Sequence, residues 1–235
     1  MTALSQIKLF ATHPHECSYL PEQEATTVFI DPEEVIDKEL YQHLSTLGFR
    51  RSGSHVYRPN CENCNACVPV RIPVDLFLPN RRQKRCARIN QDIDIQEVDS
   101  ASSDEHYELY ERYITTRHKD GDMYPPSREQ FSGFLTSEWG LTRFFEMRLH
   151  KKLVGVMVCD LLNDGLSAVY TYFDPEYPKR SLGVFGILSQ IQQAQTFSLK
   201  YLYLGYWIKE SQKMSYKSEY RPLELLIEKR WRLLL

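Results

Sequence analysis

The last hundred residues hold the pattern that most restricts how this chain can fold. Three apolar segments, at residues 143–149, 153–162 and 166–173, follow one another through short connections and are typical of strands. The second connection is Asn163-Asp164-Gly165, and an Asp-Gly pair between two apolar runs is a strong hairpin signal. We therefore predict an antiparallel meander of three strands.

An amphipathic helix and a further strand are predicted after the meander. The strand covers residues 201–208, and the helix is indicated by apolar residues at helical spacing, namely Val184, Ile187, Leu188 and Ile191. A meander, a helix and then a strand is the core order of the acetyltransferase-like (GNAT) fold, which this part of the sequence resembles. We expect an α+β protein with a GNAT-like core and a mixed sheet in a C-terminal domain, residues 91–235. Residues 1–90 are expected to form a smaller, cysteine-bearing α/β domain.

Capping signals predict three helices before the meander. Asp31, followed by a proline and two glutamates, is a strong helix start, and Gly48 offers a C-terminal stop. Ser102 with Glu105 three residues later forms the capping-box pattern of a second helix. A third helix is predicted to begin near Ser127.

The overall charge limits how this chain can contact nucleic acid. The 235 residues carry a formal net charge of −2, so any polyanion must be held by a local patch. No apolar run is long enough to span a membrane, and residues 1–8 lack the apolar region of a signal peptide. We therefore expect a cytoplasmic protein with no membrane partner and with reduced thiols.

A local basic patch is present at residues 81–88, which hold five positive charges in eight positions. Phosphate contacts need such a density of cations, and they position a nucleic acid without reading its sequence. The alternative is a solvated surface face. The candidate phosphate-binding residues are Arg81, Arg82, Lys84 and Arg85.

Half of the six cysteines lie within seven residues. Cys61, Cys64 and Cys67 are separated by two-residue gaps, and Cys17 is a candidate fourth ligand. Closely spaced thiolates can occupy neighbouring positions of a zinc or iron–sulfur site. The alternative is that these thiols are small apolar fillers in a proline-rich loop.

Two further groups of residues suggest chemistry. Asp160 and Asp174 lie near the ends of adjacent predicted strands, with Tyr172 nearby, and a carboxylate or phenol there could accept a proton from an amine. An Asp at a strand end more often caps a turn. The cations of the second group recur every four residues and would form one face for a carboxylate or phosphate, unless that face is simply solvated; they are Lys213, Lys217 and Arg221.

Several long segments together resemble one known family, the bacterial aspartate/glutamate leucyltransferases, which are relatives of the eukaryotic arginyl-tRNA–protein transferases. The resemblance spans nearly the whole chain. The matching segments are residues 17–24, 48–53, Tyr57-Arg58-Pro59 with the cysteine run, 117–123, 164–170, Ser181-Leu182-Gly183 and 201–222.

The resemblance implies transfer of leucine from leucyl-tRNA to the α-amino group of proteins with N-terminal Asp or Glu, which marks them for N-end rule degradation. No ATP and no cofactor would be needed, because the tRNA ester is already activated. The basic patch at 81–85 would hold the tRNA. The acidic N-terminal residue would be bound by Lys213, Lys217, Arg221 or Arg71, and aromatics near Tyr172 and Tyr206 would line the leucyl pocket.

Two differences from related sequence motifs bear on the cofactor and on the alternative functions. The eukaryotic relatives carry a Cys-Gly-Tyr-Cys motif where this chain reads Cys17-Ser18-Tyr19-Leu20, so a zinc or iron–sulfur cofactor at the cysteines is uncertain. The loop at residues 180–186 has its second glycine one place later than the usual coenzyme A-binding loop, which weakens a coenzyme A assignment. The alternatives are a coenzyme A-dependent N-acyltransferase and a non-catalytic, metal-bound tRNA-binding module.

Overall fold

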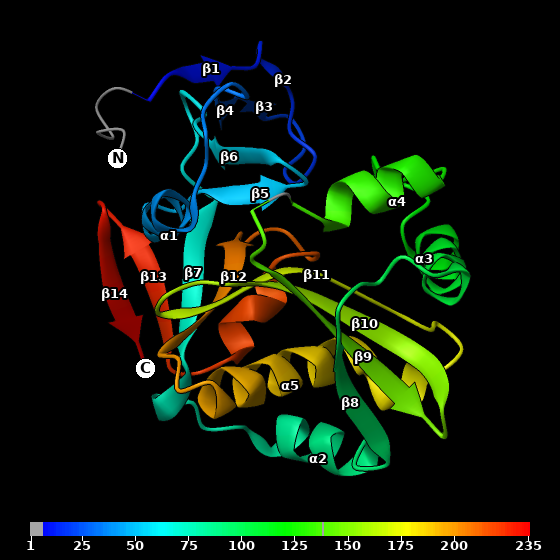
Figure 1. Cartoon of the computed structure of the whole chain (residues 1–235). Coiled ribbons are helices and arrows are strands. Elements are labelled where there is room, and N and C mark those ends of the chain that lie inside the picture. The colour runs from blue at the N-terminus through cyan, green and yellow to red at the C-terminus, as the bar shows by residue number, and fades with distance from the viewer. Residues whose placement is uncertain (1–6, 138) are drawn as a thin grey trace.

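An eight-stranded mixed sheet forms the centre of the computed structural model, which describes residues 7–137 and 139–235 (Figure 1). The segment used to predict the absence of a signal peptide lies mostly outside these residues. No helix within the described ranges is long and apolar enough to cross a membrane. The strand order of the large sheet is β14 (Arg230–Leu234), β13 (Leu223–Ile227), β7 (Val68–Pro73), β12 (Tyr201–Trp207), β11 (Gly165–Phe173), β10 (Lys152–Leu161), β9 (Thr142–Leu149) and β8 (Ile93–Val98).

The predicted meander is confirmed as β9, β10 and β11, which pair antiparallel. β12 then runs parallel to β11, which makes the sheet mixed and confirms the α+β class. Gly165 begins β11 at a point of close approach, because a Cβ atom there would lie 2.5 Å from the Tyr201 carbonyl oxygen. Only a glycine lets the two strands come together without a shift.

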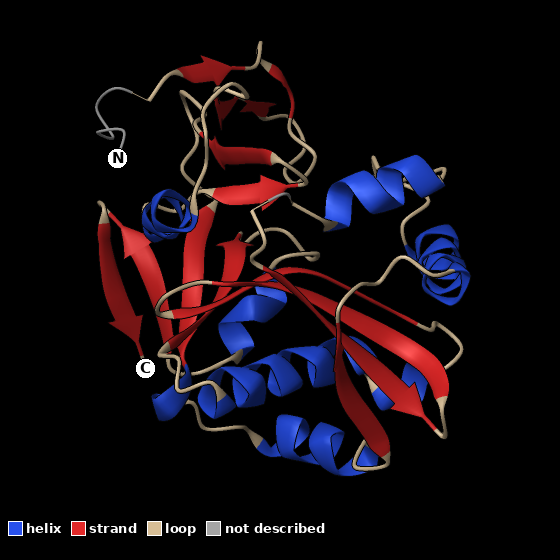
Figure 2. Ribbon diagram, in the orientation of Figure 1, coloured by secondary structure: helices blue, strands red, loops and turns tan. Residues whose placement is uncertain are grey.

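Helix α5 (Leu182–Thr196) covers one face of the sheet, and α2 (Arg81–Ile89) lies against α5 on the outside (Figures 1 and 2). The amphipathic helix predicted before β12 is therefore confirmed. Ile187 and Ile191 are buried in the main core with Leu202 and Leu204 of β12. Burial of this apolar face holds α5 against the strands.

Helices α3 (Asp104–Arg117) and α4 (Arg128–Leu135) cover the end of β10 and β11 on another side (Figure 1). Ser127 caps α4, as predicted. The cap of α3 is Ser103, one residue later than predicted, because its hydroxyl meets the backbone N–H of His106. The His106 ring then takes the place expected for the Glu105 carboxylate in the capping box.

The N-terminal part forms a second sheet above the first, with α1 (Lys38–Thr46) beside it (Figure 2). Its strand order is β1 (Leu9–Ala11), β4 (Thr27–Ile30), β6 (His55–Pro59) and β5 (Arg50–Ser52), and a separate pair joins β2 (His15–Glu16) to β3 (Glu24–Ala25).

The predicted start of the first helix is wrong by six residues. Asp37 caps α1 by accepting a hydrogen bond from the Leu40 N–H at 2.8 Å. Asp31 instead accepts from the Glu33 N–H at 3.0 Å, which closes a local turn before the helix begins.

The two predicted domains share the large sheet. β7 comes from residues 1–90 yet lies between β12 and β13, and α2 packs on α5. The remaining helical elements are single 3₁₀ turns at η2 (Val74–Leu76), η3 (Pro178–Arg180) and η4 (Ser215–Glu219). The predicted boundary between two domains at residue 90 therefore stays a prediction.

Candidate functional site

The candidate site lies where β11 and β12 part. Their parallel pairing covers only Gly165–Ser167 against Tyr201–Tyr203. Beyond this point β11 has an irregularity in its pairing with β10, between Val158 and Cys159 of β10. β12 has another in its pairing with β7, between Tyr203 and Gly205. The two strands therefore diverge and leave the backbone of β11 after Ser167 without a β12 partner.

Arg50 from β5 fills the gap between the diverging strands. Its Nη1 donates to the Ser167 hydroxyl at 2.8 Å, and its Nη2 donates to the Ala168 carbonyl oxygen. On the other side is Gly205, which has a φ of +77° and where a Cβ would lie 3.4 Å from Arg50 Nε. Arg50 is half-buried, and no described Asp or Glu lies within 4.0 Å of its guanidinium.

Lys217 from η4 is a second cation at the same place. Its Nζ donates to the Tyr206 carbonyl oxygen at 2.5 Å and lies 3.2 Å from Met214 Sδ. Only 6% of the residue is exposed, and none of the ion pairs among the described residues includes it. Burial and, to a smaller extent, the positive charge of Arg50 lower the pKa of Lys217 to about 7, and the Cys67 thiol partly opposes this change.

Segments distant in sequence meet around these two cations. Burial raises the pKa of Tyr19 to about 12, and Tyr57, Cys67, Cys17 and Asp122 raise it in the same direction. Charges act over short distances in a protein, so the loops that hold these residues lie near one another. These residues belong to three of the segments that carry the family resemblance, namely residues 17–24, Tyr57-Arg58-Pro59 with the cysteine run, and residues 117–123.

The four cysteines predicted to bind a metal are half-buried and free. Burial, together with the nearby thiols of Cys61, Cys17 and Cys64, raises the pKa of Cys67 to about 11. Within the described part of the chain, however, no three His, Cys, Asp or Glu side chains are arranged to hold a metal ion. Cys61 Sγ lies 3.8 Å from the Thr26 carbonyl oxygen. A metal ion or cluster at these cysteines stays a prediction, and no step below depends on one.

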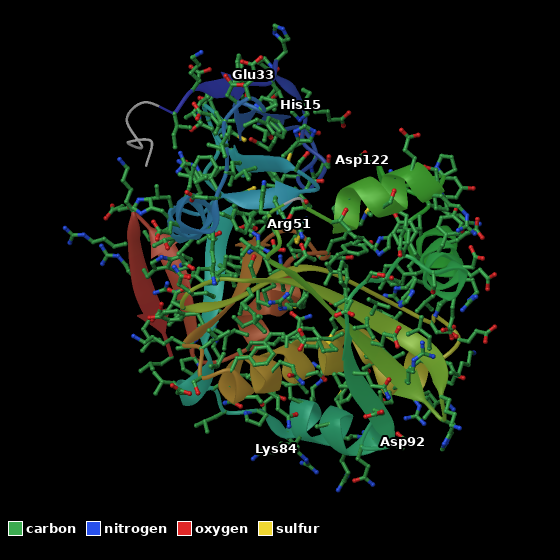
Figure 3. The ribbon with its side chains drawn as sticks, viewed as in Figure 1. His15, Glu33, Arg51, Lys84, Asp92 and Asp122 are labelled. Atoms are coloured by element: carbon green, nitrogen blue, oxygen red, sulfur yellow. The ribbon has the colours of Figure 1, made fainter. Side chains whose placement is uncertain are left out.

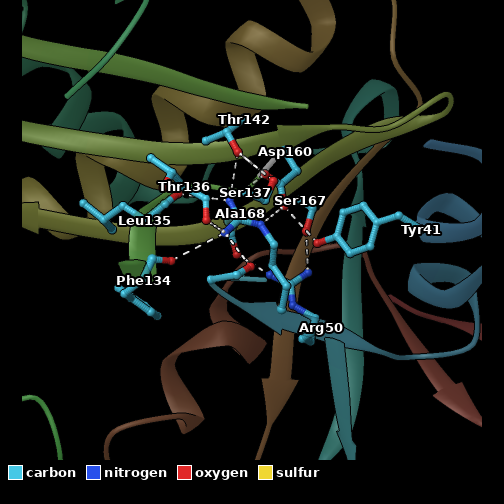
Figure 4. A network of polar contacts seen from close by, with 12 residues as sticks. Tyr41, Arg50, Phe134, Leu135, Thr136, Ser137, Thr142, Asp160, Ser167 and Ala168 are labelled. Carbon is cyan, nitrogen blue, oxygen red and sulfur yellow. Dashed lines mark hydrogen bonds and ion pairs between the residues drawn. The ribbon is translucent and has the colours of Figure 1, made fainter. Parts of the chain in front are cut away.

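Asp160, predicted as a proton acceptor, is the centre of a buried polar network that joins the two sheets (Figure 4). Arg51 Nε and Nη2 donate to its two carboxylate oxygens at 2.6 and 2.7 Å, and both side chains are fully buried. Tyr41 and Thr142 hydroxyls donate to the same carboxylate at 2.9 and 3.1 Å. The prediction for Asp160 is therefore corrected, because an incoming amine has no access to a carboxylate held in this way.

The other two predicted proton acceptors are also enclosed. Tyr172 is fully buried among the aromatic side chains of α3 and α4, and burial raises the pKa of its phenol well above the usual range. Asp174 is 1% exposed, and its Oδ2 lies 3.0 Å from Lys152 Nζ. The structure speaks against both as acceptors of a substrate proton.

The predicted cationic face does not form, because its segment folds as turns and one 3₁₀ turn instead of an α-helix. Lys213 is exposed and pairs with Asp120 at 2.7 Å. Arg221 donates to the backbone oxygens of Ser218 and Leu235 at 2.9 and 3.2 Å. Only Lys217 reaches the parting of the strands.

Arg71, the fourth predicted cation, is already occupied. It forms an ion pair with Glu224 at 2.6 Å, and its guanidinium lies 3.5 Å from the Tyr201 ring centroid and 4.3 Å from that of Trp231. Only 7% of the residue is exposed. These contacts make Arg71 a structural residue, so its predicted role in substrate binding is corrected.

The basic patch forms the outer face of α2. Gln83, Cys86 and Asn90 are its buried residues, whereas Arg81, Arg82, Lys84 and Arg85 are exposed. Figure 3 shows Lys84 on the outside of the molecule. The ion pairs of the described residues include one from this face, Arg82 to Glu219 at 3.6 Å. Four clustered cations are thus open to a polyanion.

A cavity of about 440 Å³ lies beside the site, between the small sheet and β7, β12 and β13. Tyr206 lines it, as predicted for a pocket, and its hydroxyl donates to the Gly48 carbonyl oxygen at 2.8 Å. Most of the wall is apolar. The lining includes Ile7, Leu9, Ile30, Leu44, Leu47, Phe49 and Leu226 with Arg58, Cys67 and Lys229.

Reasoning from sequence patterns missed Arg50 and most of this cavity. Arg50 lies in the 48–53 segment of the family resemblance, but an arginine beside a second arginine gives no local sign of its function. The cavity walls come from seven different segments of the chain. In the sequence, only the family resemblance pointed to the segments that hold Arg50 and the cavity.

Comparisons with known proteins agree with the resemblance. The family models for the N terminus and the C terminus of arginine-tRNA-protein transferase match residues 15–85 and 105–227. Proteins named aspartate/glutamate leucyltransferase are 58% identical in Teredinibacter turnerae, 56% in Pseudomonas fluorescens and 55% in Saccharophagus degradans. Each alignment covers 98% of this chain and 96–98% of the relative.

Solved structures give more distant similarities. L-PGS from Bacillus licheniformis is 10% identical with a TM-score of 0.46, over 61% of this chain and 47% of that one. FemX is 8% identical with a TM-score of 0.45, over 86% and 80% of the two chains.

Proposed function

The chain belongs to the arginine-tRNA-protein transferase family, and we propose that it transfers leucine from leucyl-tRNA to the α-amino group of proteins that begin with Asp or Glu. The observation that carries this proposal is the identity of 55–58% to proteins named aspartate/glutamate leucyltransferase, over almost the full length of each chain. The product marks proteins for N-end rule degradation in the cytoplasm, as the family resemblance implies.

We further propose that the core is GNAT-like. β8 is followed by α3 and α4, then by the meander β9–β11, then by α5 and a strand β12 parallel to β11. This is the element order expected for that fold. Donor and acceptor would then meet where β11 and β12 part, beside Arg50 and Lys217.

The reaction exchanges an ester for an amide. The acceptor nitrogen attacks the leucyl carbonyl carbon, a C–N bond forms, and the C–O bond to the tRNA ribose breaks. The amine loses a proton, and the ribose oxygen gains one. The protein's contribution is to align the two substrates and to stabilise the tetrahedral oxyanion, since the ester is already activated. Asp160, Tyr172 and Asp174 are too enclosed to take part in the proton transfer.

The apolar cavity is the proposed site for the leucyl side chain. Aliphatic side chains form most of its wall, and Tyr206 joins it to the parting of the strands, because its carbonyl oxygen binds Lys217. An apolar pocket discriminates by shape and size, with a modest free-energy difference for each methylene group.

Filling this cavity is expected to slow leucine transfer. Leu226 lines the cavity, and a Leu226→Trp substitution should lower kcat/KM for leucyl-tRNA by roughly 10-fold, because the larger ring takes the space of the leucyl group. The control is Ile227→Trp, since this neighbour on β13 is 42% exposed and does not line the cavity. Equal transfer rates in the two variants would place the leucyl group elsewhere.

The proposed function is tested by a transfer assay with purified protein. Radiolabelled leucyl-tRNA is incubated with peptides that begin with Asp, Glu or Arg and are otherwise identical. Label is expected to enter the Asp and Glu peptides only. If no peptide is labelled while acetyl-coenzyme A is consumed in a parallel assay, the coenzyme A-dependent acyltransferase is correct instead.

A further inference from the structure

The Arg50 guanidinium and the Lys217 amine lie at the same place between the diverging strands, and no described Asp or Glu forms an ion pair with either. Arg50 packs against Gly205, where a Cβ would lie 3.4 Å from its Nε, and Lys217 Nζ binds the carbonyl oxygen of the next residue, Tyr206. Neither side chain belongs to an ion pair of the described residues. The groups that they contact are neutral, namely the Ser167 hydroxyl, the carbonyl oxygens of Ala168 and Tyr206 and the Met214 thioether. Asp160 lies opposite Ser167 on β10, but its carboxylate is already paired with Arg51.

Such a pair is costly unless a ligand completes it. Buried charges in proteins are normally paired, because a cation taken out of water loses hydration that neutral dipoles replace only in part. Other buried cations of this chain follow the rule. Arg51 pairs with Asp160, and Arg71 pairs with Glu224. Lys217 is the exception among the buried cations of the described residues. Arg50, which is half-buried like the unpaired Arg58, lies beside it at the proposed reaction site.

Both side chains keep free donors. Arg50 uses one N–H of Nη1 and one of Nη2 in the hydrogen bonds found, which leaves Nε and two further N–H groups. The Lys217 ammonium has three donors, of which two meet the Tyr206 carbonyl oxygen and Met214 Sδ, so one is left. The free donors of the two side chains suit an anion with two oxygen atoms.

We propose that Arg50 and Lys217 bind the side-chain carboxylate of the acceptor's N-terminal Asp or Glu and so determine the specificity of the transfer. The inference rests on the proposed function, which supplies an acidic acceptor. A phosphate of the tRNA is the other anion available to the site. The carboxylate fits better because Lys217 is 6% exposed, whereas a polynucleotide backbone is bound by exposed cations such as those of α2.

The test compares acidic acceptors with their uncharged amides. Peptides beginning with Asp, Asn, Glu or Gln are assayed at saturating leucyl-tRNA with the wild-type protein and with Lys217→Met and Arg50→Gln. The control is Lys209→Met, an exposed lysine in the same loop. Thermal unfolding verifies that each variant is folded. If Arg50→Gln does not fold, Lys217→Met alone decides the question. Where an amide peptide reacts too slowly, its inhibition constant against the acidic peptide replaces kcat/KM.

Loss of either cation is expected to lower kcat/KM for the Asp and Glu peptides by about 30-fold or more, because one partner of a buried charge pair is removed. Values for the Asn and Gln peptides should stay within about threefold, so the preference for acidic acceptors collapses, and Lys209→Met should keep it. An equal fall for all four peptides, an unchanged preference, or a rise confined to the KM for leucyl-tRNA would overturn the proposal. A wild-type protein that labels no peptide would instead refute the proposed function itself.

Discussion

Replacing Arg51 by Leu is expected to lower the free energy of unfolding by about 3–5 kcal/mol, because the Asp160 carboxylate is then left charged, buried and unpaired. Both side chains have no exposed surface. Arg51 also donates to the Leu135 carbonyl oxygen at 3.2 Å and to the Thr142 hydroxyl at 3.1 Å. The substitution therefore loosens β5, the end of α4 and β10 together (Figure 4). Urea unfolding at pH 7, followed by far-UV circular dichroism, measures the change.

A double-mutant cycle separates the ion pair from the packing. Arg51→Leu with Asp160→Leu removes both charges and should recover part of the lost stability, since a buried pair replaced by apolar residues is often close to neutral. Arg51→Lys is a second control, and it should also be destabilising, because an ammonium cannot make the two parallel hydrogen bonds of the guanidinium. A loss below about 1 kcal/mol in Arg51→Leu would show that water or another cation reaches Asp160.

The sequence predicts the meander, α5 and β12 well because their signals are local. Period-two apolar patterns, the Asp164-Gly165 turn and the helical spacing of Ile187 and Ile191 each act over a few residues. The cap of α4 at Ser127 is local as well, and it is correct. The cap of α1 fails because Asp31 closes a turn with Glu33 instead of starting a helix.

The site depends on contacts between distant residues. Arg51 and Asp160 are 109 positions apart in the chain, and Arg50 and Ser167 are 117 positions apart. No local pattern separates a catalytic Asp from one held by a buried Arg. The four-residue spacing around Lys217 predicts a shared face in a helix or a compactly wound loop, but these residues form turns with one 3₁₀ turn, and Lys213 and Arg221 make contacts elsewhere. Arg50 and Lys217 both lie in segments that carry the family resemblance, but only the structure shows which side chains of these segments contact one another.

Replacing the four exposed cations of α2 together by Gln is expected to raise the KM for leucyl-tRNA by roughly 100-fold at low salt, because each cation that meets a phosphate adds to the affinity. The substituted residues are Arg81, Arg82, Lys84 and Arg85. Gln is a good helix former, so α2 should persist. Its capping box at Asn80 and its buried Gln83 and Cys86 are unchanged.

The dependence on salt distinguishes phosphate contacts from a general loss of activity. With the four cations in place, the logarithm of tRNA affinity should fall steeply with the logarithm of salt concentration, and the variant's slope should be smaller by roughly 3. Arg128→Gln with Arg143→Gln is the matched control, because Asp104 and Glu97 already pair with these arginines. The KM for an Asp peptide at saturating leucyl-tRNA should not change in either variant. An unchanged slope after loss of all four charges would assign the tRNA to another face and leave α2 as a solvated helix.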